Sequence, residues 1–210
     1  VYREDVEPAY VAANGRAPSD GREVRKAMLP HPYFKAWSAL RYSAQELTWW
    51  SVLPQVERQL PQLVETARQA ARENPSGGSL RLNPALEIPK EVEQLDIHLM
   101  PGCYHTEHAA DDVAAGAVYT YGTSVFGGAL KLKTPRGGVA ASIARWIATT
   151  RPDFRPARLL DLGCTTGNNL FPYLEVFPDC EGYGVDVGAP LLRYAHARAE
   201  TLGLKVHFSQ

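Results

Sequence analysis

A short glycine-containing stretch, Leu159–Asn169 (LLDLGCTTGNN), limits what this chain can fold into more than any other feature. The apolar run from Arg158 to Leu162 predicts a buried strand, and apolar residues at helical spacing follow the second glycine. Gly163 and Gly167 therefore lie in a tight strand-to-helix turn, where residues without a Cβ allow unusual backbone angles or the close approach of another group. Such a turn is typical of a ligand site in an α/β protein.

The sequence around this turn alternates between helix and strand patterns. Helices are predicted at 139–150, from the turn to about 177, and at 191–202, and further strands at 182–187 and 205–208. Asn168 or Asn169 is the expected N-cap of the middle helix, and Gly203 closes the last one. This alternation predicts an α/β fold class with a parallel sheet.

The N-terminal part of the chain has a different pattern. Residues 1–32 are polar and rich in Pro and Gly, so we expect an arm that wraps a body. A helical pattern begins at Ser43, and Pro54 and Pro61 interrupt it. Because an interior proline destabilises a helix by about 3 kcal/mol, we expect two or three short helices there.

Residues 80–135 give a weaker pattern, with a short strand possible at 95–100 and either a helix or an extended run at 111–121. The sequence therefore predicts two domains. Residues 1–136 form an N-terminal arm and a mainly helical cap that shapes a substrate region, and residues 137–210 form the sheet domain.

Two carboxylates accompany the glycine turn. Asp186 ends the second strand, where an acidic side chain accepts hydrogen bonds from ribose hydroxyls. Asp161 stands two residues before Gly163, where it would repel a pyrophosphate and suit an ammonium group. A dinucleotide site uses G-x-G-x-x-G, and this chain has no third glycine at the required place. These features favour a phosphate-free ligand such as S-adenosylmethionine. An NAD(P)-dependent oxidoreductase, whose ligand carries a pyrophosphate, is the alternative interpretation.

The segments LLDLGCTTGNNL and GYGVDVGAPLLRYAHARAETLG together resemble the first half of a class I S-adenosylmethionine-dependent methyltransferase. The first motif of that family is an acidic residue, x, Gly, x, Gly, x, Gly. Asp161, Gly163 and Gly167 match it, and Thr165 stands at the middle glycine. The resemblance covers about residues 137–210 and implies a Rossmann-like parallel sheet.

The resemblance also implies the cofactor and its contacts. The cofactor is S-adenosylmethionine, and its expected contacts are Asp161, Gly163, Cys164, Thr165, Gly167, Asn168, Asp186 and Val187. Asp186 would hold the ribose hydroxyls, Val187 would lie near the adenine, and Cys164 is a small packing residue rather than a nucleophile. The implied function is methyl transfer to an oxygen, nitrogen or carbon of a small-molecule acceptor. A non-catalytic binding or assembly module with the same fold is the alternative.

In the complete fold of that family the first strand is central. In these 210 residues we expect the strand at 158–162 to have an unpaired edge, which favours association. We therefore expect the sequence to be an incomplete, truncated part of a longer enzyme, or the sheet to be completed by another segment or by a second chain in a homodimer.

Histidines and acids cluster between residues 98 and 112. They comprise His98, His105, Glu107, His108, Asp111 and Asp112. Their spacing fits no compact metal signature, so we predict no metal site and a polar loop at the mouth of the active site. His105 is a candidate general base for an acceptor hydroxyl or amine. Tyr119 and Tyr121 either contact the ligand or pack in an aromatic core.

The composition of the chain limits the kinds of partner that we expect. The net charge of −1 gives no reason to expect nucleic acid, and no apolar run is long enough for a membrane span. The three scattered cysteines suit a reducing compartment. We therefore expect a cytoplasmic protein that binds a small molecule.

Overall fold

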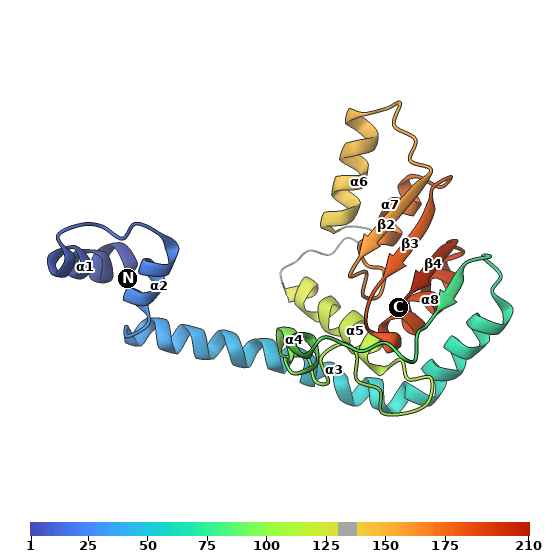
Figure 1. The fold of residues 1–210 in the computed structure, drawn as a ribbon, viewed down its shortest axis with the longest axis horizontal. Helices are drawn as coiled ribbons and strands as arrows, with labels where there is room; N and C mark the ends of the chain where they lie inside the picture. Colours follow the sequence, from blue (N-terminus) through green and yellow to red (C-terminus); the bar gives the residue numbers. More distant parts are fainter. Residues whose placement is uncertain (130–137) are drawn as a thin grey trace. The chain divides into compact units, whose positions relative to one another are not determined.

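The computed structural model describes residues 1–129 and 138–210 of the chain (Figure 1). Two compact units are distinguished, unit 1 at Val1–Leu47 and unit 2 at Thr48–Gln210. The domain boundary expected between residues 136 and 137 lies outside the described residues. None of the helices in the two described ranges is long and apolar enough to cross a membrane.

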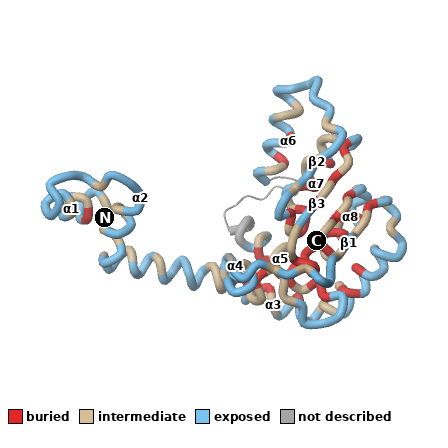
Figure 2. The backbone as a smooth tube through the Cα atoms, in the orientation of Figure 1, coloured by how far each residue is buried: buried red, intermediate tan, exposed pale blue. Residues whose placement is uncertain are grey.

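Unit 1, which includes the arm expected at residues 1–32, is largely helical. It contains η1 (Tyr2–Val6), α1 (Glu7–Asn14), α2 (Gly21–Met28) and the first part of α3 (Pro32–Glu73). The prolines and glycines lie between these helices or at their ends, where they do not interrupt helical hydrogen bonds. In residues 1–47, all of which the structure describes, Val6 alone is buried, and most of this unit is drawn as exposed or intermediate (Figure 2).

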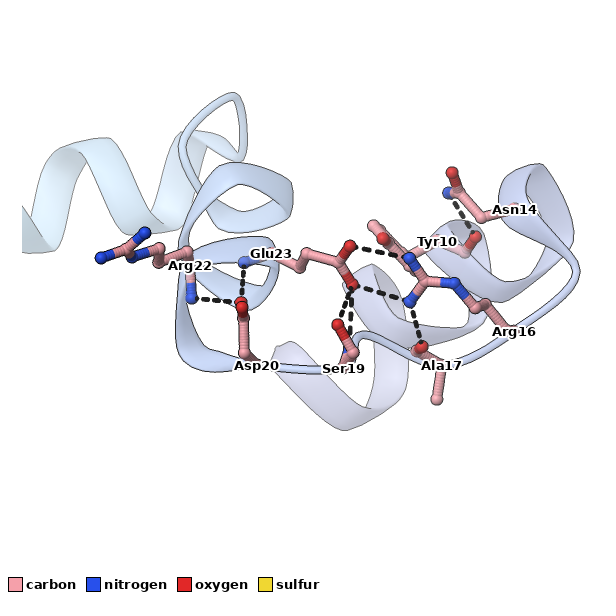
Figure 3. Close-up of polar contacts among 8 residues, drawn as sticks. All are labelled: Tyr10, Asn14, Arg16, Ala17, Ser19, Asp20, Arg22 and Glu23. Atoms are coloured by element: carbon pink, nitrogen blue, oxygen red, sulfur yellow. Dashed lines mark hydrogen bonds and ion pairs between the residues drawn. The ribbon is translucent and has the colours of Figure 1, made fainter.

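Polar contacts join α1 and α2 in unit 1 (Figure 3). Asp20 caps α2, because its Oδ1 accepts hydrogen bonds from the backbone N–H groups of Arg22 and Glu23, both at 2.9 Å. Arg16 donates two hydrogen bonds of 2.7 Å to the Glu23 carboxylate, which also accepts from the Ser19 backbone at 2.8 Å. This bidentate pair fixes the loop between the two helices.

Helix α3 runs without a break through both of its prolines, so the expectation of two or three short helices is wrong. Each proline lacks an N–H group and removes one helical hydrogen bond. The apolar face that follows Leu47 is buried in unit 2, through Trp49, Val52, Val56, Val64 and Ala67. Burial of each of the larger side chains among these contributes about 1.5–3 kcal/mol, which together offsets the cost of about 3 kcal/mol for each proline.

Unit 2 is a mixed α/β structure around a four-stranded parallel sheet of order β1-β4-β3-β2. Its strands are β1 (Ser79–Arg81), β2 (Arg158–Leu162), β3 (Glu181–Val185) and β4 (Val206–Ser209). Its helices besides α3 are α4 (Lys90–Glu93), η2 (Ile97–Leu99), α5 (Ala114–Ala129), α6 (Val139–Thr150), α7 (Leu170–Val176) and α8 (Ala189–Leu202). The α/β class and the parallel sheet predicted from the sequence are confirmed.

Most predicted elements near the glycine turn agree with these bounds. The predicted 158–162 strand coincides with β2, and the other two predicted strands differ from β3 and β4 by one or two residues. The strand expected at 95–100 is wrong, since a short 3-10 helix, η2, lies there. Of the two alternatives for 111–121, the helix is correct and begins at Ala114. Strand β1 was not predicted, because three residues are too few to show alternation.

One core of unit 2 lies between the sheet and the helices α7 and α8. Phe171 and Leu174 of α7 and Leu192 of α8 pack with Val206 and Phe208 of β4. Leu160 and Leu162 of β2 alternate with the inward-facing residues and remain 56% and 74% exposed. The sheet is therefore apolar and covered on one face, while β2 keeps exposed leucines on the other.

Strand β2 lies at one end of the sheet, and no strand of the described part of the chain pairs with its outer edge. This confirms the expected free edge. Helix α6 packs against α7, yet Val139 and Trp146 of its apolar face are 76% and 64% exposed. The sequence correctly predicted the helix at 139–150, but not the exposure of this face.

A buried histidine makes the sheet–helix packing sensitive to acid. The His196 side chain is 3% exposed, and neither ring nitrogen has a hydrogen-bond partner in residues 1–129 and 138–210. Glu200 Oε1 lies 3.6 Å from His196 Nε2, but it already accepts a hydrogen bond from the Ser76 hydroxyl. Burial lowers the pKa of His196 below its ordinary 6.5, and the nearby Glu200 opposes this shift only in part.

We predict that unit 2 loses stability as the pH falls below about 6.5. The unfolded chain binds a proton on His196 there while the folded chain does not, so the free energy of unfolding falls by at most about 1.4 kcal/mol per pH unit. Urea unfolding of wild type and His196→Gln between pH 7.5 and 5 measures this. The exposed His108→Gln is the matched control, and an unchanged slope in His196→Gln would contradict the assignment.

Candidate functional site

The glycine turn follows β2 and adopts the left-handed backbone at three alternate residues. Gly163, Thr165 and Gly167 have φ values of 72°, 48° and 78°. Two of the three are glycines, as this conformation favours, and Thr165 is a β-branched residue held in a strained conformation that costs about 1–2 kcal/mol. The turn is therefore fixed by the surrounding structure and not by local preference alone.

The end of β3 holds this turn through its backbone. Gly163 N and Cys164 N both donate to the Val185 carbonyl oxygen, at 2.8 and 3.1 Å. The Phe171 ring lies directly against Gly167, since a Cβ on that glycine would lie 2.3 Å from the ring. Gly167 is therefore needed both for its backbone angle and for the close approach of Phe171.

Asp186 is turned toward the glycine turn. Its Oδ2 accepts a hydrogen bond of 2.9 Å from the Thr165 backbone N–H, and its Oδ1 accepts one of 2.9 Å from Gly188 N–H. Each carboxylate oxygen has a second lone pair, so this arrangement fixes the side chain and leaves acceptors for a ligand hydroxyl.

Asp161 lies at the end of β2, close enough to interact electrostatically with Asp186. Its Oδ2 is buried and has no hydrogen-bond partner among the described residues. Burial, together with the nearby negative charge of Asp186, raises the pKa of Asp161. A half-buried carboxylate without a cation is unfavourable in the protein alone, and a ligand cation would relieve it.

An arginine that the sequence analysis missed supports the turn from α8. Arg198 Nη1 donates to the Thr166 carbonyl oxygen at 2.6 Å and to Asn168 Oδ1 at 2.8 Å, and its guanidinium lies 5.2 Å from the Phe171 ring centroid. Thr166 is fully buried and accepts a further hydrogen bond of 3.1 Å from Thr120 of α5. The Asn168 amide oxygen, expected at the cofactor, is bonded within the protein. No sequence pattern marks Arg198, because its partners lie 32 and 30 residues away in the chain.

Two other expected contacts have different surroundings. Cys164 is 2% exposed, and burial, with smaller effects of Asp186 and Asp161, raises the pKa of its thiol. The thiol is therefore protonated at neutral pH, which suits packing and not nucleophilic attack. The Val187 carbonyl accepts a hydrogen bond of 3.0 Å from Gln210, which brings the ends of β3 and β4 together.

The residues of the histidine–acid cluster separate into different local contacts. His98 hydrogen-bonds Tyr104, Arg68 pairs with Asp111 at 2.9 Å, and Arg193 pairs with Glu107. Asp112 is fully buried and accepts from Ala114 N at 2.7 Å, at the start of α5. Within the described ranges no three histidine, cysteine or acidic side chains converge as metal ligands.

The aromatic residues before α6 pack with one another. The Tyr119 ring stacks on Trp49 at 6.4 Å and meets Tyr104 edge-on at 5.7 Å. Tyr121 contacts the same cluster. Core packing is therefore observed for both tyrosines, and their contact with a ligand stays a prediction. The site that remains is the edge of the sheet where Asp161, the glycine turn and Asp186 meet.

Comparison with known proteins gives one distant relative. The chain is 29% identical over 65 residues to the uncharacterized protein RP789 of Rickettsia prowazekii (strain Madrid E). This match covers 31% of the chain and 12% of that protein's length. No family model matches the chain, and no solved structure matches it.

We predict that Gly167→Ala destabilises unit 2 by about 1–3 kcal/mol more than Gly203→Ala. Both glycines have a positive φ, of 78° and 66°, so both variants carry the same left-handed strain. Only Gly167→Ala also displaces a packed ring, because nothing lies within 4 Å of a Cβ at Gly203. Chemical unfolding of the two variants measures the difference, and equal losses would show that Phe171 does not pack as described.

Proposed function

We propose that unit 2 binds S-adenosylmethionine at the glycine turn and is part of an enzyme that methylates an oxygen, nitrogen or carbon of a small-molecule acceptor. The observation that carries this proposal is the pair of carboxylates at the turn. Asp161 has a buried, unpaired oxygen, and Asp186 is fixed toward the same backbone. The neighbouring parallel strands β4, β3 and β2 have the order expected for the first three strands of a Rossmann-like sheet.

The charges at the turn favour S-adenosylmethionine over a dinucleotide that carries a pyrophosphate. Two carboxylates disfavour a pyrophosphate, and the Arg198 guanidinium is engaged by Thr166 and Asn168 on the protein side. An ammonium group would satisfy the unpaired oxygen of Asp161, and ribose hydroxyls would donate to Asp186. S-adenosylmethionine carries both groups and no phosphate.

The chemical contribution of this cofactor is a methyl group on a positively charged sulfur. The residues of the chain would bind and orient it. Asp161 and Asp186 would hold a cationic nucleoside, while Gly163, which has nothing within 4 Å of a Cβ position, would allow the ligand to approach the backbone. Holding two reactants in place accounts for a large share of the rate in such a transfer.

We predict that calorimetry detects S-adenosylhomocysteine binding to the chain and no binding of NAD or NADP. S-adenosylhomocysteine keeps the ammonium group and the ribose, so it tests both carboxylates without turnover. Binding of NAD or NADP alone would favour an oxidoreductase. Binding of none of the three would favour the non-catalytic module.

We predict that Asp161→Asn changes stability and affinity in opposite directions. Because the pKa of Asp161 is raised in the fold, its ionised form at pH 7 destabilises the protein, and removing the charge raises the free energy of unfolding. Loss of a charge-assisted hydrogen bond, about 1.5–3 kcal/mol, weakens S-adenosylhomocysteine binding about 10- to 100-fold. The exposed Asp153→Asn should change neither quantity. A loss of stability without a loss of affinity in Asp161→Asn would contradict a ligand role.

A further inference from the structure

Arg198 of α8 carries a half-buried positive charge, and no acidic side chain of the described residues forms an ion pair with it. Its Nη1 donates to the Thr166 carbonyl oxygen and to Asn168 Oδ1, which are both neutral acceptors. Burial lowers the pKa of Arg198, and Tyr194 alone acts against this shift. A buried charge is normally paired with an opposite charge, as Arg193 on the same helix is with Glu107.

The part of the chain outside the described ranges offers no counter-ion either. Its eight residues, LKLKTPRG at 130–137, contain three basic side chains and no acid. The Arg198 charge is therefore left for an anion that these 210 residues do not supply.

The Arg198 guanidinium has unused hydrogen-bond donors. Of its five N–H groups, those on Nε and Nη2 have no partner among the described residues. Neither nitrogen belongs to the fully buried atoms that lack a partner, so both remain accessible. The Phe171 ring lies 5.2 Å from the guanidinium carbon and covers one planar face. The free edge formed by Nε and Nη2 matches a carboxylate, which accepts two parallel hydrogen bonds.

A cleft of about 270 Å³, called the small cleft below, lies beside Arg198 between α3 and α8. Arg198 is the single charged side chain among its described lining residues, and the hydroxyls of Thr66 and Thr201 already donate to carbonyl oxygens of their own helices. Walls of this kind suit a ligand with an apolar body and one negative charge. Besides Arg198, the lining residues are Leu63, Thr66, Tyr194, Ala197, Thr201 and Leu202.

The small cleft is distinct from the carboxylate pair at the glycine turn. Arg198 does not contribute to the raised pKa of Asp161, and Asp161 does not contribute to the lowered pKa of Arg198. Asp161 lines a different cleft, of about 410 Å³, and Arg198 is not among the residues of that cleft. An amino-acid tail carries its ammonium and carboxylate groups on one carbon atom. A tail held by Asp161 would therefore leave Arg198 free for a second molecule.

We propose that Arg198 binds the carboxylate of a small apolar organic acid, of about the size of benzoate, whose body lies in the small cleft. Nε and Nη2 donate to the two carboxylate oxygens, and Leu63 and Leu202 contact the apolar body. This site goes beyond the proposed function and does not depend on the binding of S-adenosylmethionine.

Photochemical labelling of the wild-type chain with 4-azidobenzoate locates the site. Illumination converts the azide into a nitrene that inserts into neighbouring bonds, so peptide mass spectrometry should find the label on α3 near Leu63 or on α8 near Leu202. Benzoate should reduce this labelling at least tenfold at a concentration at which benzamide, which has the same ring and no charge, reduces it less than twofold. Labelling confined to other segments, or equal competition by benzamide, would overturn the proposal.

Matched variants test the two parts of the site separately. Arg198→Lys keeps the positive charge and removes the two-donor edge, so benzoate affinity measured by calorimetry should fall at least fivefold. Arg193→Lys, at an arginine that already has an acidic partner, should stay within about twofold. Thr201→Phe leaves Arg198 intact and fills the small cleft from an exposed helix residue, so it should also weaken benzoate at least fivefold. Circular dichroism checks folding, and unchanged affinity in Thr201→Phe would contradict the placement of the ligand.

Other anions are distinguished by competition for the same label. Displacement by S-adenosylhomocysteine but not by 5′-methylthioadenosine, which lacks the amino-acid tail, would assign Arg198 to the cofactor tail and overturn the proposal. Displacement by inorganic phosphate at a lower concentration than benzoate would do the same. Benzoate binding to a chain that fails to bind S-adenosylhomocysteine would support this site and count against the proposed function alone.

Discussion

The Asp186 carboxylate is the contact on which the rest of the site depends. It accepts one backbone hydrogen bond from Thr165 in the glycine turn and one from Gly188 at the start of α8. A single side chain thus joins the loop after β2 to the loop after β3. The turn itself contains a strained threonine, so it needs such an external anchor. Because hydrogen bonds to charged groups contribute about 1.5–3 kcal/mol, this anchor is comparable in energy to the strain that it holds.

The electrostatics at the turn are unfavourable in the protein alone. Asp161 and Asp186 are close enough to interact electrostatically, and the Arg198 guanidinium is bonded to Thr166 and Asn168. Burial and the Asp186 charge raise the pKa of Asp161, which means that its ionised form is unfavourable in the protein. A cationic ligand would neutralise that charge. Arg198 instead stabilises the backbone beneath the turn. One oxygen of Asp161 is therefore left without a partner in the described residues, while Asp186 and Arg198 bond to the backbone around it.

The loop at residues 98–105 and the glycine turn follow one physical pattern. Both place non-glycine residues at positive φ, and both are fixed by buried anchors, Met100 and Cys103 in one case and Thr166 in the other. They approach each other through Gly188, which lies against the Tyr104 carbonyl and donates to Asp186. Strain concentrated on two sides of one carboxylate is typical of a site that is organised before its ligand arrives. Asp161 supplies an unpaired carboxylate oxygen close to that carboxylate.

The sequence by itself determined the α/β class, the elements from residue 139 onward and the position of the glycine turn, because hydrophobic period and glycine spacing are local properties. It failed at Pro54 and Pro61, where burial of larger side chains such as Trp49 and Val56 offsets the cost of two interior prolines. Only the tertiary structure decided that Arg198 supports the turn, that Asp161 has an unpaired oxygen, and that the loop at residues 98–105 reaches Gly188. These features involve contacts between residues far apart in the chain, and such contacts produce no periodic pattern in a single sequence.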